Sequence, residues 1–328
     1  MKYYEILPQK GFYLLAGLFI LWGILGKMDS SNYTYRGFQT GDNNQIINLD
    51  EDGPAASAGF ELGDVIITNG GIDQNDNKAL SKRSRPNIGD KRIYVVDRDG
   101  ESVSLELTFS ELPDTDKSLN NVGFIMGLLF VFIGLFMFRK NDSPLTKAFT
   151  IFVLCFGFIF FDGPYLEPGF LKTLVNCIST SIVLLSFAFM MTYMLEFPPQ
   201  AKIPKFLFIP ALVVIALVCI LSIVRPDGSG TFNMILRLIF GVTIIFYFLG
   251  SLITLIKKYA GATPEARSET GLNLMLAGAL IGLLPIIIYF TASVISPGID
   301  LPGNDYIFIT FLAIPICFAM ALNKQTAN

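Results

Sequence analysis

The feature that most constrains this chain is a series of long apolar stretches within its 328 residues. A membrane-spanning helix needs about 20 mostly apolar residues to cross roughly 30 Å of hydrocarbon. With 52% hydrophobic residues and a mean hydropathy of +0.55, the chain has the composition that such helices require. The sequence predicts a polytopic α-helical membrane protein with about eight transmembrane helices. The stretches lie at about 11–26, 121–138, 148–163, 171–195, 206–224, 233–256, 271–291 and 305–322.

A long polar segment interrupts the series after its first member. The sequence therefore predicts an N-terminal transmembrane anchor at 1–27, a small inserted domain at 28–118 and a seven-helix transmembrane bundle at 119–328. The anchor is expected to stay uncleaved, because only Lys2 and Lys10 precede its apolar run and no clear small-x-small cleavage site follows it.

The short loops of the bundle differ in positive charge, and this difference predicts an orientation. Lysine and arginine collect in cytoplasmic loops. One set of loops is rich in them, whereas the opposite set pairs Lys172 with Glu167 and Arg225 with Asp227. Both termini are expected in the cytoplasm, with the 28–118 domain outside. The cation-rich set comprises Lys2, Lys10, Arg139, Lys140, Lys147, Lys202, Lys205, Lys257, Lys258, Arg267 and Lys324.

Composition also excludes several classes of chemistry. The chain contains no histidine, which removes H-E-x-x-H zinc proteases, Ser-His-Asp hydrolysis and a phospho-accepting histidine. The four cysteines lie inside apolar stretches without metal-ligand spacing. The net charge is −3, with no basic patch interleaved with aromatic residues, so we expect no nucleic acid partner. We expect no enzyme activity, no metal and no cofactor.

The polar segment has the pattern of a small α+β domain. Short β-rich runs occur at 45–49 and 64–69, and 91–109 reads as a hairpin because Asp99-Gly100 is a strong turn signal. Two short helices are expected, one in "PAASAG" and a weaker one in "NKALSKRSR".

One motif makes this domain more specific. "GPAASAGFELGDVIITNGG" at 53–71 resembles the central motif of bacterial PDZ domains, and "VVDRDGESVSLEL" at 95–107 resembles their closing hairpin. The resemblance covers about residues 33–112. It implies a peptide whose C-terminal carboxylate lies in a backbone nest while the peptide adds a strand to the sheet. The nest would be formed by Tyr35, Arg36, Gly37 and Phe38, and the groove wall would carry Ala79 and Leu80.

Polar side chains inside apolar stretches are candidates for function. Arg237 lies near the outer end of its stretch, where it either extends to the membrane surface or pairs with Asp162 or an anionic ligand. Asn176, Ser179 and Thr180 share a helix face, where they serve either helix–helix hydrogen bonds or a ligand.

The order of one helix, an outward PDZ-like domain and seven more helices resembles the membrane sensor half of ComP-type histidine kinases, which detect secreted peptide signals. "MLEFPP" at 194–199 and "AIPICFAMAL" at 313–322 resemble local features of that family. Kinase domains do not follow within this sequence. Both a truncated kinase sensor and a stand-alone relative are compatible with this pattern.

These observations lead to an expected function and two alternatives. The leading expectation is a signal-sensing module in the bacterial cytoplasmic (inner) membrane, which binds an extracytoplasmic peptide or protein C-terminus and passes the change inward. One alternative is a PDZ scaffold that recruits another envelope protein; the other is a transporter-like protein with an accessory PDZ domain. The expected partners are membrane lipid, the extracytoplasmic ligand, a separate signalling or envelope protein, and a second copy in a homodimer.

Overall fold

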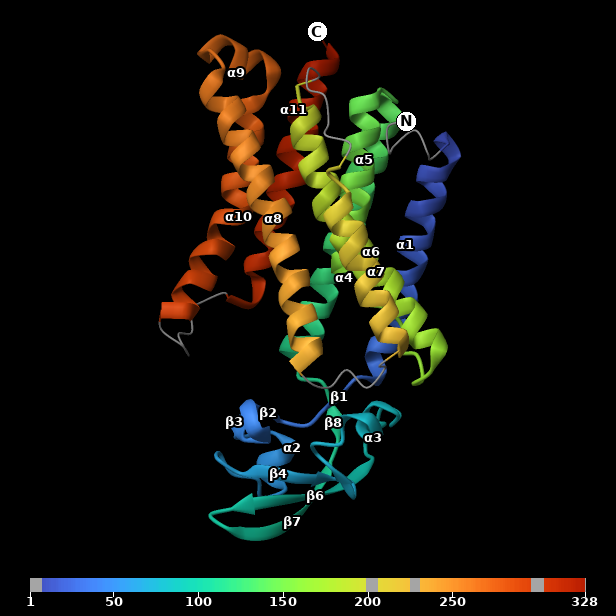
Figure 1. The fold of residues 1–328 in the computed structure, drawn as a ribbon, viewed down its shortest axis with the longest axis vertical. Helices are drawn as coiled ribbons and strands as arrows, with labels where there is room; N and C mark the ends of the chain where they lie inside the picture. The colour runs from blue at the N-terminus through green and yellow to red at the C-terminus, as the bar shows by residue number, and fades with distance from the viewer. Residues whose placement is uncertain (1–7, 199–205, 225–230, 296–303, 328) are drawn as a thin grey trace.

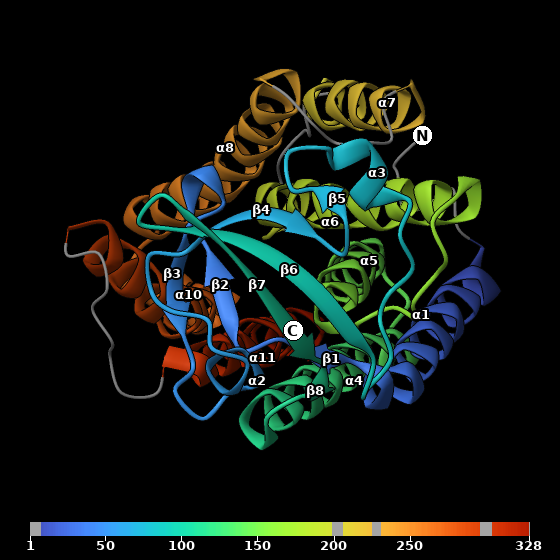
Figure 2. The ribbon, with the colours of Figure 1, turned by 90° about the horizontal axis from the view of Figure 1, so that it is seen from below.

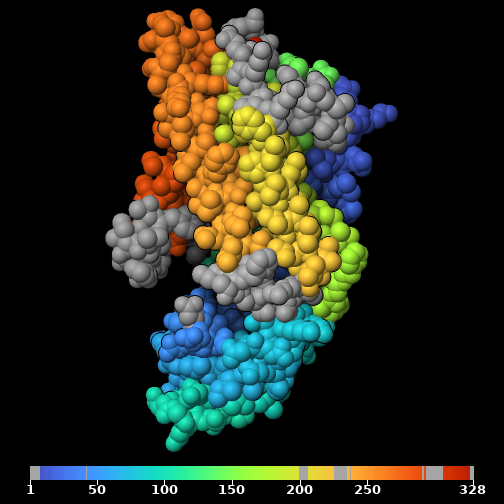
Figure 3. All heavy atoms as spheres, in the orientation of Figure 1, coloured from blue at the N-terminus to red at the C-terminus, as the bar shows by residue number. Residues whose placement is uncertain are grey.

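The computed structural model describes residues 8–198, 206–224, 231–295 and 304–327. The molecule consists of a helix bundle with a small β-rich domain at one end (Figure 1). In the space-filling view the small domain, in blue and teal, forms a separate mass at that end (Figure 3). Helix α1 begins and helix α11 ends at the opposite end of the bundle (Figure 1). This placement fits the expectation that both termini lie on one side of the membrane.

Six helical segments among the described residues are long and apolar enough to cross a membrane, which confirms a multi-pass protein. The expected number of about eight is met only in part, because two further apolar helices are shorter: α5, Pro144–Gly157, and α7, Ile209–Val224. The long segments contain α1 (Gln9–Asp29), α4 (Asp114–Lys140), α6 (Phe170–Glu196), α8 (Thr231–Gly261), α10 (Leu272–Ile295), and the 3-10 turns of η5 (Asn304–Leu312) followed by α11 (Ala313–Ala327).

Helix α5 is short and lies inside the bundle. At 1.5 Å per residue its 14 residues span only about 21 Å. It packs between α4 and α6, and every residue from Ala148 to Gly157 is buried. A backbone enclosed by protein does not face lipid, so this helix need not match the bilayer thickness. The 3-10 turn η4, Phe158–Phe160, continues it toward the small domain.

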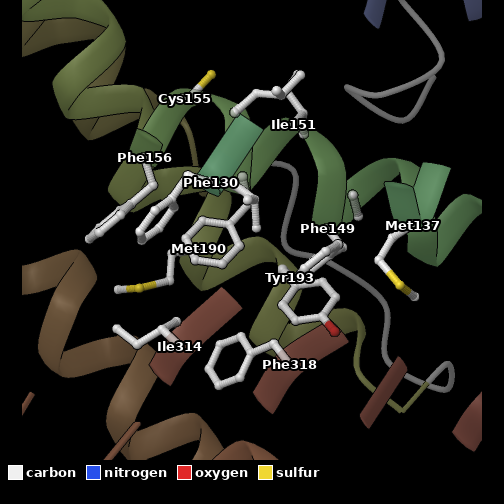
Figure 4. Close-up of a cluster of buried hydrophobic side chains, with 14 of the residues drawn as sticks. Phe130, Met137, Phe149, Ile151, Cys155, Phe156, Met190, Tyr193, Ile314 and Phe318 are labelled. Atoms are coloured by element: carbon white, nitrogen blue, oxygen red, sulfur yellow. The ribbon is translucent and has the colours of Figure 1, made fainter. Parts of the chain in front are cut away.

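Aromatic rings fill the centre of the bundle (Figure 4). The ring of Tyr193 on α6 lies 5.5 Å from that of Phe149 and 6.0 Å from that of Phe318, between centroids. Phe152 is fully buried and joins the same group. The sequence places these rings on α5, α6 and α11, so this cluster holds three helices together.

The end of α6 farthest from the small domain is closed by a lysine from α8. The Lys258 ammonium donates hydrogen bonds to the carbonyl oxygens of Met194, Leu195 and Phe197, at 2.9, 2.7 and 2.5 Å. The last carbonyls of a helix have no partners within the helix, and a cation there also interacts favourably with the helix dipole.

The small domain contains three antiparallel sheets and two short helices (Figure 2). Its main sheet has the strand order β5-β4-β6-β7, while β2 pairs with β3 and β1 with β8. The bounds are β1 Thr34–Tyr35, β2 Phe38–Thr40, β3 Ile46–Leu49, α2 Pro54–Ser57, β4 Val65–Asn69, β5 Ile72–Asp73, α3 Asn77–Ser81, β6 Lys91–Arg98, β7 Glu101–Thr108 and β8 Ser110–Glu111. Helix α4 begins at Asp114, a few residues before the expected boundary at 118.

The expected strands, the hairpin and the first helix all form. Asp99 and Gly100 both have positive φ, 53° and 89°, as the two central residues of a type I′ turn require. Helix α2 buries Ala55 completely, which explains the run of small residues in the motif. Phe38, Phe60 and Tyr94 pack together in the core, with centroids 5.3 to 6.0 Å apart.

The aspartate of the PDZ-like motif has a structural role. Asp64 is 2% exposed and forms a two-pronged ion pair with Arg98, with both N–O distances at 2.8 Å. It also accepts a hydrogen bond from the Glu61 N–H. Burial alone would raise the pKa of the Asp64 carboxyl, but Arg98 and this N–H hold the pKa below its usual value. The pair fixes the turn after α2 to the long hairpin.

Candidate functional site: the carboxylate loop and the domain junction

The proposed carboxylate loop has the backbone shape that its sequence suggests. Gly37 has φ of +81°, a conformation that favours glycine. Its carbonyl oxygen accepts a hydrogen bond from the Asp50 N–H, and among the described residues no acceptor is bonded to its own N–H. A Cβ at this position would lie 2.9 Å from the Pro54 Cδ atom. The loop is therefore held against the start of α2 with one backbone donor unused.

The side chains beside Gly37 are engaged within the domain. The Arg36 guanidinium lies over the Phe38 ring, 4.5 Å from its centroid, and its Nε donates to the Phe38 carbonyl oxygen. The Tyr35 hydroxyl lies 3.2 Å from an Asp50 carboxylate oxygen. Burial and the nearby Asp50 raise the pKa of Tyr35. The Asp50 carboxylate would repel an incoming anion, so we expect the loop to bind a carboxylate only weakly.

The expected groove wall lies apart from this loop. Ala79 and Leu80 are half-buried on α3, a helix of five residues. Figure 2 shows α3 beside β5, and Figures 1 and 2 both show α3 separated from β2. After α3, Arg83 donates hydrogen bonds to the carbonyl oxygens of Asn69 and Gly70, which ties this segment to the end of β4.

The small domain is fastened to the bundle through Arg85. Its guanidinium makes a two-pronged ion pair with Asp29 at the end of α1, with N–O distances of 2.9 and 2.8 Å. Tyr165, between η4 and α6, completes the junction: its N–H donates to Asp29, and its hydroxyl accepts from the Arg85 N–H. Ser84 donates to Glu167 at 2.6 Å. A few charged and aromatic side chains therefore set the position of the domain over the helices.

A cavity of about 580 Å³ lies at this junction. Its volume is within the range of small-molecule sites, about 300–1,000 Å³. The small domain, α1, the segment after α5 and the first turns of α6 all contribute to its wall. The residues that line it include Trp22, Arg85, Phe158, Asp162, Lys172, Asn176, Ser179 and Val183.

The structure brings some of the predicted polar residues together and separates others. Asp162, Asn176 and Ser179 line the junction cavity, whereas Thr180 does not. The side chain of Arg237 lies outside the described residues, so its pairing with Asp162 stays a prediction.

Sequence reasoning missed the residues that build the junction. Asp29, Arg85 and Tyr165 belong to three segments, and Asp29 and Arg85 are 56 positions apart. The available signal was weak: one acidic residue directly after the first apolar stretch, and one aromatic residue in a short outer loop.

Comparison with known proteins gives a partial likeness to a solved structure. No protein-family model matches the chain, and no curated protein matches it. Among solved structures, a match is found to an HtrA-type protease, AlgW, determined with a decapeptide. The match has 26% identity and a TM-score of 0.22, and it covers 25% of this chain and 30% of that chain. The chain thus spans less than a third of the length of the protease.

Proposed function

We propose that this protein is a membrane receptor module whose small domain binds the free C-terminus of an extracytoplasmic peptide or protein. The observation that carries the proposal is the loop at Gly37, which combines a left-handed backbone, an unused N–H and the motif sequence of a PDZ-like domain. Such loops bind a terminal carboxylate through backbone donors while the peptide extends a sheet. The short β2 and the nearby Asp50 indicate micromolar affinity or weaker, about −8 kcal/mol or less favourable.

The junction supplies a route by which peptide binding to the small domain is passed to the transmembrane helices. Arg85 follows α3 in the small domain, and its partner Asp29 is the last residue of α1. A peptide that shifts the domain would therefore act directly on α1 and, through Tyr165, on the segment that leads into α6. The contacts are few and polar, so a modest binding energy is sufficient to rearrange them.

Peptide binding is tested on the full chain in lipid nanodiscs. A library of peptides with free C-termini is screened, and the best binder is compared with its C-terminal amide. Amidation removes a charge-assisted hydrogen bond and should weaken binding about ten-fold, or roughly 1.4 kcal/mol. Equal binding of acid and amide would exclude the carboxylate site.

The variant and its matched control for this test each remove one positive charge from the small domain. Arg36→Gln should weaken binding of the free acid, whereas Lys78→Gln on the exposed face of α3 should leave it unchanged. Gly37→Val is a poor choice, because a β-branched residue conflicts both with φ of +81° and with Pro54. Its loss of binding would not separate a damaged loop from a damaged domain.

A receptor and a scaffold differ in what the peptide does to the junction. Spin labels at Asn77 on the small domain and Leu171 at the start of α6 report the distance between the two parts. A receptor should show a changed distance distribution when peptide binds. Binding with an unchanged distribution would favour a scaffold that only recruits another envelope protein.

Orientation has its own test. Asn77 is exposed on the small domain, and Ser268 is exposed on α9, Pro264–Thr270, at the opposite end of the molecule. A cysteine at Asn77 should react with a membrane-impermeant reagent in intact cells, whereas one at Ser268 should react only after the membrane is opened. The reverse pattern would place the small domain in the cytoplasm.

A further inference from the structure

The junction cavity is graded in polarity along its depth. Lys172, Asn176, Ser179 and Val183 lie on one face of α6 and cover about 16 Å along the helix axis at 1.5 Å per residue. The charged member is nearest the small domain, the neutral polar members follow, and the apolar member is deepest. A gradient of this kind matches a molecule with a polar head and a hydrocarbon tail, aligned along the membrane normal.

Two helices line the cavity without packing extensively on each other. Helix α1 packs on α4 and α5, whereas α6 packs on α5, α7 and α8. Both α1 and α6 nevertheless line the cavity, through Trp22 and the α6 face. Trp22 lies seven residues before the end of α1, about 10 Å along the axis from Asp29, so the deeper part of the cavity is inside the hydrocarbon region.

The charges around the cavity leave one cation available. Arg85 is taken by Asp29, and the cavity wall also holds the carboxyl group of Asp162. Lys172 lies 5.4 Å from the centroid of the Tyr165 ring, and in the described part of the chain no carboxylate pairs with it. The hydroxyl of Ser179 and the amide of Asn176 likewise make no hydrogen bond within that part, unlike Thr173 and Ser181, which bond back to their own helix.

We propose that the junction cavity binds an anionic amphiphile with a single hydrocarbon chain, which enters from the membrane between α1 and α6. Its head group binds Lys172, with Asn176 and Ser179 as further partners, and its chain lies against Trp22, Phe158 and Val183. The shared ligand chemistry is that of a fatty acid carboxylate or a lysophosphate. This inference does not depend on peptide binding by the small domain.

The chain offers an internal probe for the test, because Trp22 is its only tryptophan. Full-length protein in zwitterionic phosphatidylcholine nanodiscs is titrated with a stearic acid brominated in mid-chain, which quenches tryptophan on contact. The expected result is saturable quenching, with a midpoint at least ten-fold lower than for the methyl ester of the same acid. Non-saturating quenching that is equal for acid and ester would mean only contact with bulk lipid, and would overturn the proposal.

Variants assign the head group and the chain. Lys172→Gln should raise the midpoint at least five-fold, whereas Lys140→Gln, the same change at the far end of α4, should not alter it. Ser179→Phe fills the cavity and should abolish saturation, whereas Leu171→Phe on the exposed side of α6 should preserve it. An unchanged midpoint in Lys172→Gln, with the emission of Trp22 intact, would refute the anionic site.

A last comparison distinguishes the two sources of the anion. Brominated lysophosphatidic acid and the brominated carboxylate are titrated side by side, and the tighter one identifies the preferred head group. Brominated lysophosphatidylcholine, which is zwitterionic, should bind more weakly than either. If it binds as tightly as the anions, the charge assignment to Lys172 is wrong.

Discussion

In the small domain, charged side chains pair with residues far along the chain, whereas in the bundle many hydroxyl groups bond to their own helix. Arg98 reaches Asp64 across 34 positions. In contrast, Thr192 and Ser251 each bond to the carbonyl four residues earlier. Thr150 bonds both to the Thr146 carbonyl of its own helix and to the Gly134 carbonyl of α4. Polar contacts therefore specify which parts of the small domain meet. In the bundle, the fit of large aromatic rings and the close approach of helices at glycine residues largely determine which helices pack together.

Close approaches at glycine show how strict this shape is. An added Cβ at Gly278 on α10 would lie 2.8 Å from the Ala313 carbonyl oxygen of α11. Near the small domain, Gly26 on α1 similarly leaves room for the Asp162 backbone. A bundle held by such contacts has few hydrogen bonds between helices. A small rigid shift of one helix against another therefore breaks few hydrogen bonds. At the junction, the long-range polar contacts of the small domain lie next to the tightly packed helices of the bundle.

The largest effect should come from removing a central ring of the bundle. Phe152→Ala should lower the free energy of unfolding by about 3 kcal/mol, because it leaves a cavity between helices. Phe132→Ala on α4, a ring that is 65% exposed at the bundle surface, should cost less than about 1 kcal/mol. Thermal unfolding in detergent measures both. Equal losses would mean that ring packing does not specify the bundle.

Next in size is the buried ion pair of the small domain. Arg98→Met should destabilise the domain by about 2–3 kcal/mol, because the buried Asp64 carboxylate loses its partner. Lys91→Met on the same hairpin breaks the exposed pair with Glu106 and should cost no more than about 0.5 kcal/mol. Hydrogen exchange of the β6 and β7 amides in the full chain reports both values. Similar exchange in the two variants would contradict the role given to Asp64.

The junction should show a smaller but coupled effect. In a double-mutant cycle, Arg85→Gln and Asp29→Asn should be non-additive by about 1 kcal/mol, because their two-pronged pair is largely shielded from solvent. Exchange of the Tyr165 amide, which donates to Asp29, provides the readout. Additive changes would show that the domain is held over the bundle by other contacts.

The smallest effect concerns acid. The folded pKa of Asp64 is lowered, so the stabilisation from its ionised form is complete above the unfolded pKa near 3.9 and is lost as pH falls through the folded value. The small domain should therefore lose protection below about pH 4. Asp64→Asn should flatten this dependence while lowering stability at neutral pH. An unchanged acid profile in that variant would assign the transition to other carboxyl groups.

The sequence predicted local features far better than long-range ones. The hairpin at Asp99-Gly100, the thin helix at Pro54 and the apolar spans follow from turn chemistry and hydropathy, which act over a few residues. Hydropathy could not show that α5 is enclosed by its neighbours, because an enclosed helix and a lipid-facing helix are equally apolar. Three polar candidates, Asp162, Asn176 and Ser179, do line one cavity.

The rest of that cavity could not be predicted, because its wall comes from distant segments. Trp22 and Phe158 read as ordinary membrane residues, and Arg85 as a surface cation of the small domain. Only the folded arrangement places them together with α6. The displacement of α3 from the loop at Gly37 has a similar origin, since Arg83 anchors it to the end of β4.

The enclosure of α5 bears on how the protein responds to bilayer thickness. Long helices such as α4 and α6 adjust to a thinner or thicker membrane by tilting, because their apolar length must match the hydrocarbon. Helix α5 lies between these two and is buried from Ala148 to Gly157, so little of it contacts lipid that would make it tilt with them. A change in thickness would thus rotate its neighbours around a fixed centre and alter the opening between α1 and α6. We therefore expect lipid composition to affect the junction even when no ligand is bound.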